Sequence, residues 1–414
     1  MMFIKNEPFN LEYSDILLDC GLKIRFIRKK GYVKKAVYLS VSFGGMYQDF
    51  TYMGKEYHIK SGIAHAIEHK IYENTDGSDS FKELSMMGVD ANAFTTQSIT
   101  CYYFLTPNEI TKPMLKTFDF IFNPSFNQNS LDREIPIILE ENRRKEEDIY
   151  YWYDYKMLEL LYGKGPKSNP VLGFTNDIKH FKAEELWDAY NSFYKPSNMN
   201  LVIVGDMDFD MVLKDIKNYF KSFKYEEFGK IKLNSEDYSD LSYTIRNSNV
   251  EIPKAALGFK IINPTIKDYY LLNALFYCMY SSSTPNRLQM IDKGLINTSL
   301  DITIFSDYNM LYTTISIEDK DASHMIDNII DNINSFDISQ ITEEDILLFK
   351  RYYLGGAYFL GDNIELLAES MAFRLCVFED ILESPKLINE ITLSDVKRCF
   401  EYYKNVKKVR ILMK

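Results

Sequence analysis

Hydrophobic and polar residues alternate in the first part of the chain in the manner of β-strands. The segments LKIRFIRK (22–29) and KAVYLSVSFGG (35–45) flank a turn at Gly31, and this arrangement predicts two paired strands. Residues 88–106, rich in Thr, Tyr and Phe, predict two further strands. The apolar segment LVIVGDMD (201–208) predicts a strand closed by a Gly-Asp turn. Apolar spacing typical of helices covers the segment after residue 61 and residues 79–87, 109–122, 131–160 and 183–193, with a polar loop at Asp76-Gly77.

The same order of elements recurs in the second half of the chain. Each half runs strand, helix, helix, strand pair, helices and strand, which indicates a diverged duplication. The expected strands of this half are KAALGFKI (254–261), SLDITIF (299–305), MLYTTISIE (310–318) and VRILM (409–413). The expected helices lie at 269–280, 286–296, 321–335, 342–359 and 363–381.

A charged stretch without helical or strand period, Lys221 to Asp240, separates the two halves and is typical of a linker. A chain of 414 residues also suits two domains better than one. We therefore expect an N-terminal domain at 1–225, a linker at 226–240 and a C-terminal domain at 241–414. The expected fold class is α+β, with two duplicated α/β domains, each an antiparallel-rich sheet covered by helices.

The segment SGIAHAIEHKIYEN (61–74) carries two of the five histidines of the chain. On a helix, His65, Glu68 and His69 fall within one arc about 100° wide, while the isoleucines that recur at every fourth position from Ile63 line the opposite arc. Imidazoles at positions i and i+4 can bind one Zn²⁺ together, and a catalytic site needs a third protein ligand and an open position. The alternative is that the two histidines are only solvated residues on a polar helix face.

A third ligand is expected from the carboxylate-rich segment LDREIPIILEENRRKEED (131–148). Glu134 and Glu141 lie seven residues apart, two helical turns, and share a face, whereas Glu140 points about 100° away. Since Pro136 is unfavourable in a helix interior, this helix is expected to begin only a residue or two before it.

Composition and charge restrict the remaining function classes. The net charge of −11 argues against a nucleic-acid-binding protein, which normally has a basic face. The five cysteines are widely separated, form no CxxC pair and predict reduced thiols in a cytoplasmic protein. The N-terminus does not resemble a signal peptide, and no apolar run is long enough for a membrane span.

The order H-x-x-E-H at residues 65–69 is the signature of the inverzincins. On this motif the chain resembles the pitrilysin/insulinase family of metallopeptidases. It is most similar to the small two-domain branch that includes the mitochondrial processing peptidases and Gram-positive bacterial relatives. The segments that carry the resemblance are GIAHAIEHKIYE (62–73), NAFTTQSITCYYF (92–104), NPVLGFTNDI (169–178) and FYKPSNMNLVIVGDMD (193–208).

This resemblance implies a zinc endopeptidase whose N-terminal domain holds Zn²⁺ through His65, His69 and Glu141. Glu134 then corresponds to the carboxylate that orients a ligand imidazole, and Glu68 to the general base.

The resemblance also implies that a peptide substrate pairs with an edge strand of the sheet. The residues at the corresponding positions are Asn92, Ala93, Phe94 and Thr95, within the segment 92–96.

The second half departs from the family pattern of an arginine followed, seven residues later, by a tyrosine. Aligned on Gly294, these positions hold Met290 and Asn297, and Arg287 lies three residues too early. We therefore expect a homologous partner subunit that supplies the missing pair, with each chain forming half of a clam-shaped heterodimer. The alternatives are a self-sufficient homodimer and a non-catalytic scaffold of the same fold.

Overall fold

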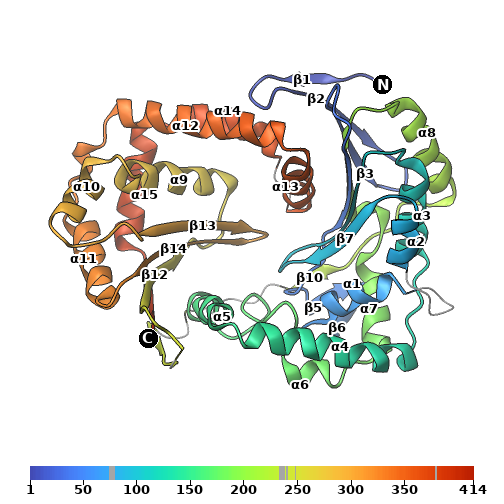
Figure 1. Cartoon of the computed structure of the whole chain (residues 1–414), viewed down its shortest axis with the longest axis horizontal. Coiled ribbons are helices and arrows are strands. Elements are labelled where there is room, and N and C mark those ends of the chain that lie inside the picture. The colour runs from blue at the N-terminus through green and yellow to red at the C-terminus, as the bar shows by residue number, and fades with distance from the viewer. Residues whose placement is uncertain (74–79, 233–237, 239–240, 248, 378–379) are drawn as a thin grey trace. The chain divides into compact units, whose positions relative to one another are not determined.

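The computed structural model describes residues 1–73, 80–232, 238, 241–247, 249–377 and 380–414, so the expected loop at Asp76-Gly77 lies outside it. The fold is mixed α+β, with helices packed on sheets rich in antiparallel strands (Figure 1), as the sequence predicts.

The chain forms two compact units, and neither is continuous in sequence. The first comprises residues 1–145, 169–234 and 357–382, and the second comprises residues 146–168, 235–356 and 383–414. The expected division at 226–240 therefore differs from the units in two segments. Helix α5 (Ile149–Tyr162) belongs to the second unit and helix α13 (Ile364–Cys376) to the first.

A seven-stranded sheet forms the centre of the first unit. Its order is β1 (Ile4–Asn6), β2 (Leu11–Leu17), β3 (Lys23–Arg28), β9 (Met199–Gly205), β4 (Lys35–Val41), β8 (Thr100–Thr106) and β7 (Asp90–Thr95). A smaller sheet joins β10 (Lys230–Ile231), β5 (Asp49–Tyr52) and β6 (Lys55–His58). Strand β10 lies within the stretch that was expected to be a linker.

Strands β3 and β4 do not pair with each other, so the expected hairpin around Gly31 is wrong. Strand β9 lies between them, parallel to β3 and antiparallel to β4. Its seven residues, MNLVIVG, are all buried. A strand that is apolar on both faces is most stable in the middle of a sheet, because helices there cover both of its faces.

Within residues 1–234 of the first unit, five helices lie where the apolar spacing predicts them: α1 (Ile63–Ile71), α2 (Ser80–Met86), α3 (Thr111–Phe122), α4 (Gln128–Glu146) and α7 (Ala183–Phe193). Two more, α6 (Thr175–Ile178) and α8 (Phe209–Tyr219), were not predicted from the sequence. The single helix expected at 131–160 is two helices, α4 and α5, which are separated by the N-cap Asp148.

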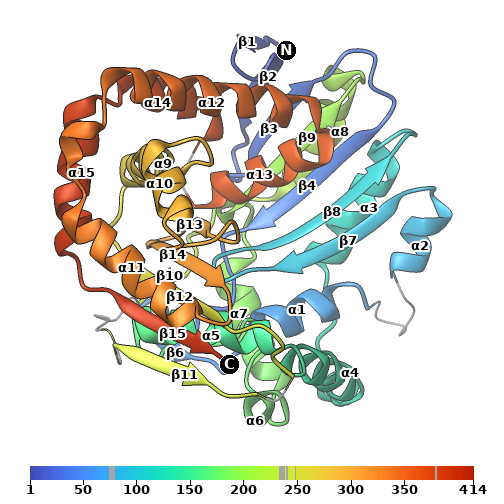
Figure 2. The ribbon, with the colours of Figure 1, turned by 60° about the vertical axis from the view of Figure 1, so that its left-hand side comes forward.

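Helix α13 packs across strands β4 and β9 (Figure 2) although more than 150 residues of chain separate it from either. Its buried side chains form one stripe along the helix: Ile364, Leu367, Ala368, Met371, Ala372 and Cys376. The two alanines let the helix approach the sheet closely. Ser40 Oγ donates a hydrogen bond to Ala372 O at 2.9 Å, and Ser42 Oγ donates one to Cys376 O at 3.1 Å.

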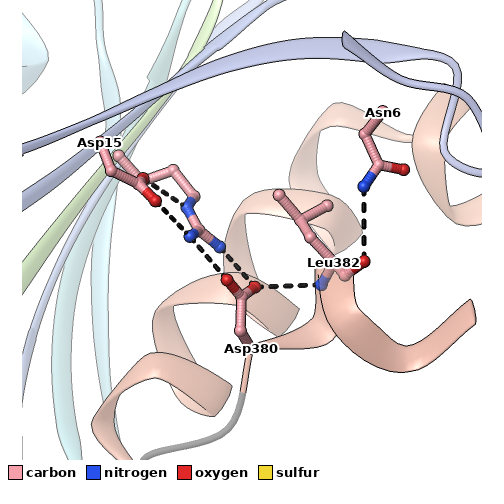
Figure 3. Close-up of polar contacts among 5 residues, drawn as sticks. Asn6, Asp15, Asp380 and Leu382 are labelled. Atoms are coloured by element: carbon pink, nitrogen blue, oxygen red, sulfur yellow. Dashed lines mark hydrogen bonds and ion pairs between the residues drawn. The ribbon is translucent and has the colours of Figure 1, made fainter. Parts of the chain in front are cut away.

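A buried arginine fixes the segment after α13 to the same sheet. Arg25 is 4% exposed and donates to both oxygens of Asp15 at 2.7 and 2.6 Å and to both oxygens of Asp380 at 2.6 and 2.8 Å. Asp380 also accepts from Leu382 N at 3.0 Å, and Asn6 Nδ2 donates to Leu382 O at 3.4 Å (Figure 3). Two carboxylates thus neutralise one guanidinium and bring distant parts of the chain together.

The second unit has a five-stranded sheet in the order β11 (Ser242–Ile245), β15 (Val409–Met413), β12 (Lys254–Lys260), β14 (Met310–Glu318) and β13 (Asp301–Asp307). Its helices are α5, α9 (Ile266–Tyr280), α10 (Pro285–Asp292), α11 (Ala322–Ser335), α14 (Ser384–Glu390) and α15 (Leu393–Asn405). Helix α12 (Glu343–Asp362) begins in this unit and ends in the first. The expected strand pair of the second half is confirmed as β13 and β14.

We expect Asp380→Asn to lower the free energy of unfolding by about 1–3 kcal/mol, because the buried Arg25 loses a charged hydrogen-bond partner. Although burial opposes its charge, the hydrogen bonds from Arg25 hold the pKa of Asp380 below its ordinary 3.8. The stabilisation is therefore present above pH 3.8 and is lost as the pH falls through the lower folded value. Urea unfolding of both proteins at pH 7 and in acid measures this difference.

The matched control is Glu12→Gln, which removes an ion pair of 3.1 Å with Arg28 on the same two strands. Both side chains of that pair are about one-third exposed, so we expect a change below about 1 kcal/mol. Equal effects of the two substitutions would contradict the assignment of Arg25 as the anchor of this segment.

Candidate metal centre

Helix α1 begins where two backbone segments touch. Gly62 and Gly173 both have left-handed backbone angles, with φ of 89° and 92°. A Cβ on Gly62 would lie 2.4 Å from Leu172 O, and a Cβ on Gly173 would lie 2.5 Å from Ser61 O. Both positions therefore require glycine, and the start of α1 is held against residues 172–173.

Hydrogen bonds fasten the same two segments together. Ser61 Oγ donates to Asp177 Oδ2 at 2.6 Å and accepts from Phe174 N at 3.0 Å. Gln97, just after the edge strand β7, donates through Nε2 to Asn169 O at 2.9 Å. The segment 169–178, singled out in the sequence only by resemblance, thus joins the start of α1 to the end of β7.

The two histidines of α1 lie side by side, with ring centroids 4.5 Å apart. The opposite face of the helix is anchored as the sequence predicts, since Ile63, Ile67 and Ile71 are at most 1% exposed. Burial of these three side chains fixes the rotation of the helix and therefore the direction of both imidazoles.

Helix α4 supplies the carboxylates opposite the histidines. It begins at Gln128, eight residues before Pro136, so the expected start one or two residues before the proline is wrong. Pro136 lies on the exposed side of the helix. The carbonyl that loses its hydrogen bond, that of Asp132, can therefore be satisfied by water, which reduces the cost of the interruption.

Glu141 is the carboxylate that meets both histidines. Its Oε2 lies 3.6 Å from His65 Nε2 and 3.3 Å from His69 Nε2. One ligand atom from each of the three residues lies within 4.8 Å of the others. Glu140 instead pairs with Arg143 and Arg144 on the helix surface.

Glu134 occupies the other side of His69. Its Oε1 lies 2.9 Å from His69 Nδ1. Because Nδ1 is engaged in this way, Nε2 of the same ring remains directed at Glu141. This arrangement fixes both the orientation of the ring and the nitrogen that it offers, as a carboxylate behind a metal-binding histidine does.

The charges of this cluster are unevenly shared. Burial and the neighbouring His69 lower the pKa of His65. Burial also opposes a charge on His69, but its hydrogen bonds to Glu134 and Glu141 outweigh burial and raise its pKa to about 9. The hydrogen bonds to His69 in turn lower the pKa of both glutamates. At neutral pH and without a metal, His65 is therefore neutral and His69 is protonated.

Glu68 faces the edge strand β7. Its Oε2 accepts a short hydrogen bond from Thr95 Oγ1. Burial raises the pKa of Glu68 above its ordinary 4.5, and it outweighs this hydrogen bond and the charge on His69, which both lower the pKa. The sequence placed Thr95 among substrate-contacting residues, and its contact with Glu68 was missed. The side-by-side placement of α1 and β7 decides that contact.

The geometry of the three converging residues fits a tetrahedral metal ion. Ligand atoms at about 2.1 Å from Zn²⁺ lie about 3.4 Å from one another, close to the 3.3 and 3.6 Å that separate Glu141 from the imidazole nitrogens. Two imidazoles and one carboxylate are a donor set used by catalytic zinc sites. A bound ion requires both imidazoles neutral, so its uptake would release the proton from His69.

The remaining candidate residues lie along β7. Within the described residues this strand pairs only with β8, so its other edge is open. Ala93 and Thr95 share the strand face toward α1, and Asn92 and Phe94 share the other. Tyr72, just after α1, donates through its hydroxyl to Asn92 O at 3.4 Å.

A cavity of about 570 Å³ opens between α1, β7 and α4. Glu68, His69 and Glu134 form its wall on the side of the candidate metal centre, and Asn92 and Ala93 form part of the wall on the side of the edge strand. Its remaining lining includes Tyr72, Glu73, Phe81, Ser130, Arg133 and Ile137. One candidate metal ligand, His69, the base Glu68 and the open strand edge therefore adjoin one space.

Comparison with protein families gives two matches that follow each other along the chain. The insulinase family, Peptidase family M16, matches residues 54–173, and the Peptidase M16 inactive domain matches residues 180–352. Together they span more than half of the chain. The chain belongs to the M16 (insulinase) family of peptidases.

Individual relatives extend this similarity over almost the whole chain. The chain is 25% identical over 397 residues to the uncharacterized zinc protease YmfH of Bacillus subtilis, covering 92% of this chain and 91% of the relative. It resembles the fold of a putative M16-like peptidase from Alicyclobacillus acidocaldarius, with a TM-score of 0.86, 19% identity and 97% and 98% coverage. A protease from Helicobacter pylori gives a TM-score of 0.80, 18% identity and 98% and 99% coverage.

Part of the second unit matches the M16 inactive domain. The three residues considered there for the arginine and tyrosine positions all contact their own unit. Met290 is 3% exposed within the hydrophobic core. Asn297 Nδ2 donates to Glu318 O at 2.9 Å and to Asp319 at 3.0 Å. The guanidinium of Arg287 donates to backbone carbonyls, including Leu300 O at 3.0 Å. All three side chains thus serve the packing of their own unit.

Two further expectations concern cysteines and membranes. All five cysteines are free, and four of them are buried. None of the helices within the described residues combines the length and the apolar composition needed to cross a bilayer.

We expect Glu141→Gln to weaken zinc retention strongly, because a neutral amide replaces the one carboxylate among the described residues that contacts both histidines in this M16 chain. Glu140→Gln is the matched control, since Glu140 is the adjacent residue and pairs with arginines on the helix surface. Elemental analysis after dialysis measures the bound zinc. Equal retention in the two variants would show that Glu141 is not a ligand.

Proposed function

We propose that this chain is a zinc metalloendopeptidase that cleaves extended peptides, as the metal-carrying half of a two-subunit enzyme. The observation that carries the proposal is the convergence of His65, His69 and Glu141, with Glu68 next to them on the same helix. Relatives named as zinc proteases support the reaction type.

The proposed roles follow from the positions of the side chains. His65, His69 and Glu141 would hold the ion, and Glu134 would keep the His69 ring in place. Zn²⁺, when bound, would lower the pKa of a water molecule and polarise the scissile carbonyl. Glu68 would take the proton of the attacking water and pass it to the leaving amine.

The open edge of β7 supports an extended substrate. A peptide that pairs with residues 92–95 would gain main-chain hydrogen bonds with little demand on its sequence. The adjoining cavity of about 570 Å³ has room for one of its side chains. Preference among peptides would then depend mainly on that cavity.

The proposed partner is a homologous chain that supplies an arginine and a tyrosine to the reaction. Met290 is buried and Asn297 is held by hydrogen bonds of its own unit, so neither is available to stabilise an oxyanion. Inserting an arginine at position 290 would place a charge in the core and would not restore the pair.

A second candidate function is a non-catalytic scaffold, which the match of residues 180–352 to the inactive domain allows. A third arrangement is a homodimer that uses other residues for the oxyanion. The four residues His65, Glu68, His69 and Glu141 favour an enzyme, since a scaffold has no physical need for all of them.

The free cysteines support a reducing, cytoplasmic location.

We expect Glu68→Gln to retain zinc and fold but to lose at least about 10²–10⁴-fold in peptide cleavage, because an amide cannot accept the proton of the water. Cleavage of a fluorogenic peptide by the active assembly measures the loss, and elemental analysis measures the metal. Glu140→Gln is again the control and should retain full activity. Substantial turnover by Glu68→Gln would remove Glu68 from the role of base.

We expect the isolated chain to be weakly active or inactive, and to gain activity only with a homologous subunit that carries the arginine and tyrosine. Missing oxyanion donors commonly cost about 10²–10³-fold in rate. A peptide assay of this chain alone, the partner alone and the mixture tests the split site. Full activity of the isolated chain, unchanged by the partner, would refute it. A zinc-loaded mixture that cleaves nothing would favour the scaffold.

A further inference from the structure

The carboxylate of Glu68 has one hydrogen-bond partner among the described residues, the hydroxyl of Thr95. The bond engages Oε2, and no other residue that the structure describes forms a hydrogen bond with Oε1. Glu68 lines the cavity beside the candidate metal centre. One oxygen of the base is therefore fixed by the edge strand, and the other is available to a water molecule.

Thr95 is itself held in a defined position. It is the last residue of β7 and pairs across the sheet with Thr100. The two hydroxyl oxygens are 3.5 Å apart, and Thr100 Oγ1 donates to Phe43 O at 2.9 Å. The next residue, Thr96, donates through its backbone N–H to Ile99 O at 2.8 Å. The sheet and the following turn thus determine where the Thr95 hydroxyl lies.

We propose that Thr95 is the positioning residue of the general base: its hydroxyl holds Glu68 Oε2 so that Oε1 faces the water that attacks the peptide. This inference rests on the proposed peptidase function. Thr95 does not take part in proton transfer. It acts through Glu68, and it also belongs to the strand with which the peptide would pair, so docking and base orientation share one residue.

The physical reason is the mobility of a glutamate side chain. Glutamate has three rotatable bonds, so holding it in one rotamer costs side-chain entropy. A hydrogen bond to a charged group contributes a free energy of similar size and can offset that cost. Without it, the carboxylate can leave the productive position, and a displacement of about 1 Å can cost about 10²-fold in rate.

The test compares Thr95→Val, which keeps the shape and removes the hydroxyl, with Thr95→Ser, which keeps the hydroxyl. Thr303→Val is the matched control, because Thr303 also lies on an edge strand of its sheet, and its hydroxyl donates to Asp301 at 3.1 Å. For the active assembly, kcat and KM are measured with a fluorogenic peptide, and bound zinc by elemental analysis. Crystal structures of the metal-free proteins report the position of the Glu68 carboxylate independently of activity.

We expect Thr95→Val to lower kcat by about 10–100-fold with KM, zinc content and melting temperature unchanged, and its Glu68 carboxylate to be displaced or spread over several rotamers. Thr95→Ser should restore kcat to within about threefold, and Thr303→Val should match the wild type. A merely structural role would lower the melting temperature and the zinc content instead.

A Glu68 carboxylate that keeps its single position in Thr95→Val, or an equal loss of kcat in Thr95→Ser and Thr95→Val, would overturn the inference. A wild-type assembly that cleaves no peptide would overturn the proposed function instead. In that case the crystal structures alone still decide whether Thr95 positions Glu68.

Discussion

The candidate metal centre depends on the close approach of two glycines. Gly62 and Gly173 leave no room for a Cβ on either side, and this contact sets where α1 begins. The first turn of α1 then determines the position of His65 along the helix axis, and the next turn determines that of His69. Because a helix is rigid over one turn, an error at its start would displace every functional group on it. The glycine contact therefore constrains the site although neither glycine carries any chemistry.

The electrostatics around α1 describe a site prepared for a cation. Two partly buried carboxylates face two imidazoles, and in the absence of a metal one proton on His69 balances part of their charge. Such a cluster is unfavourable to bury unless its charges are paired. A divalent ion between His65, His69 and Glu141 would replace that proton and satisfy the same carboxylate. Glu68 interacts with the charge on His69, but its hydrogen-bond partner belongs to the edge strand.

The two units consist of similar elements, but their polar side chains have different roles. In the first unit, polar residues of α1 and α4 converge on one point. In the second, Asn286 and Asn332 form two hydrogen bonds with each other, and Arg287 donates to carbonyls of its own unit. These three polar side chains are engaged in internal hydrogen bonds, and Met290 contributes to the core. Among the described residues, only the first unit brings together a set of donors suited to a metal ion.

Several features were determined by the sequence alone because they depend on short-range periodicity. The spacing of His65, Glu68 and His69 predicts their shared helix face, and the seven-residue interval from Glu134 to Glu141 predicts theirs. Only tertiary structure decided which elements became neighbours. Strand β9 lies between β3 and β4, and α13 returns to the first unit. The reason is that burying apolar surface stabilises the fold irrespective of how far apart the two surfaces lie along the chain. The same long-range packing sets the hydrogen bond from Thr95 to Glu68, whose partners come from two elements that no local pattern connects.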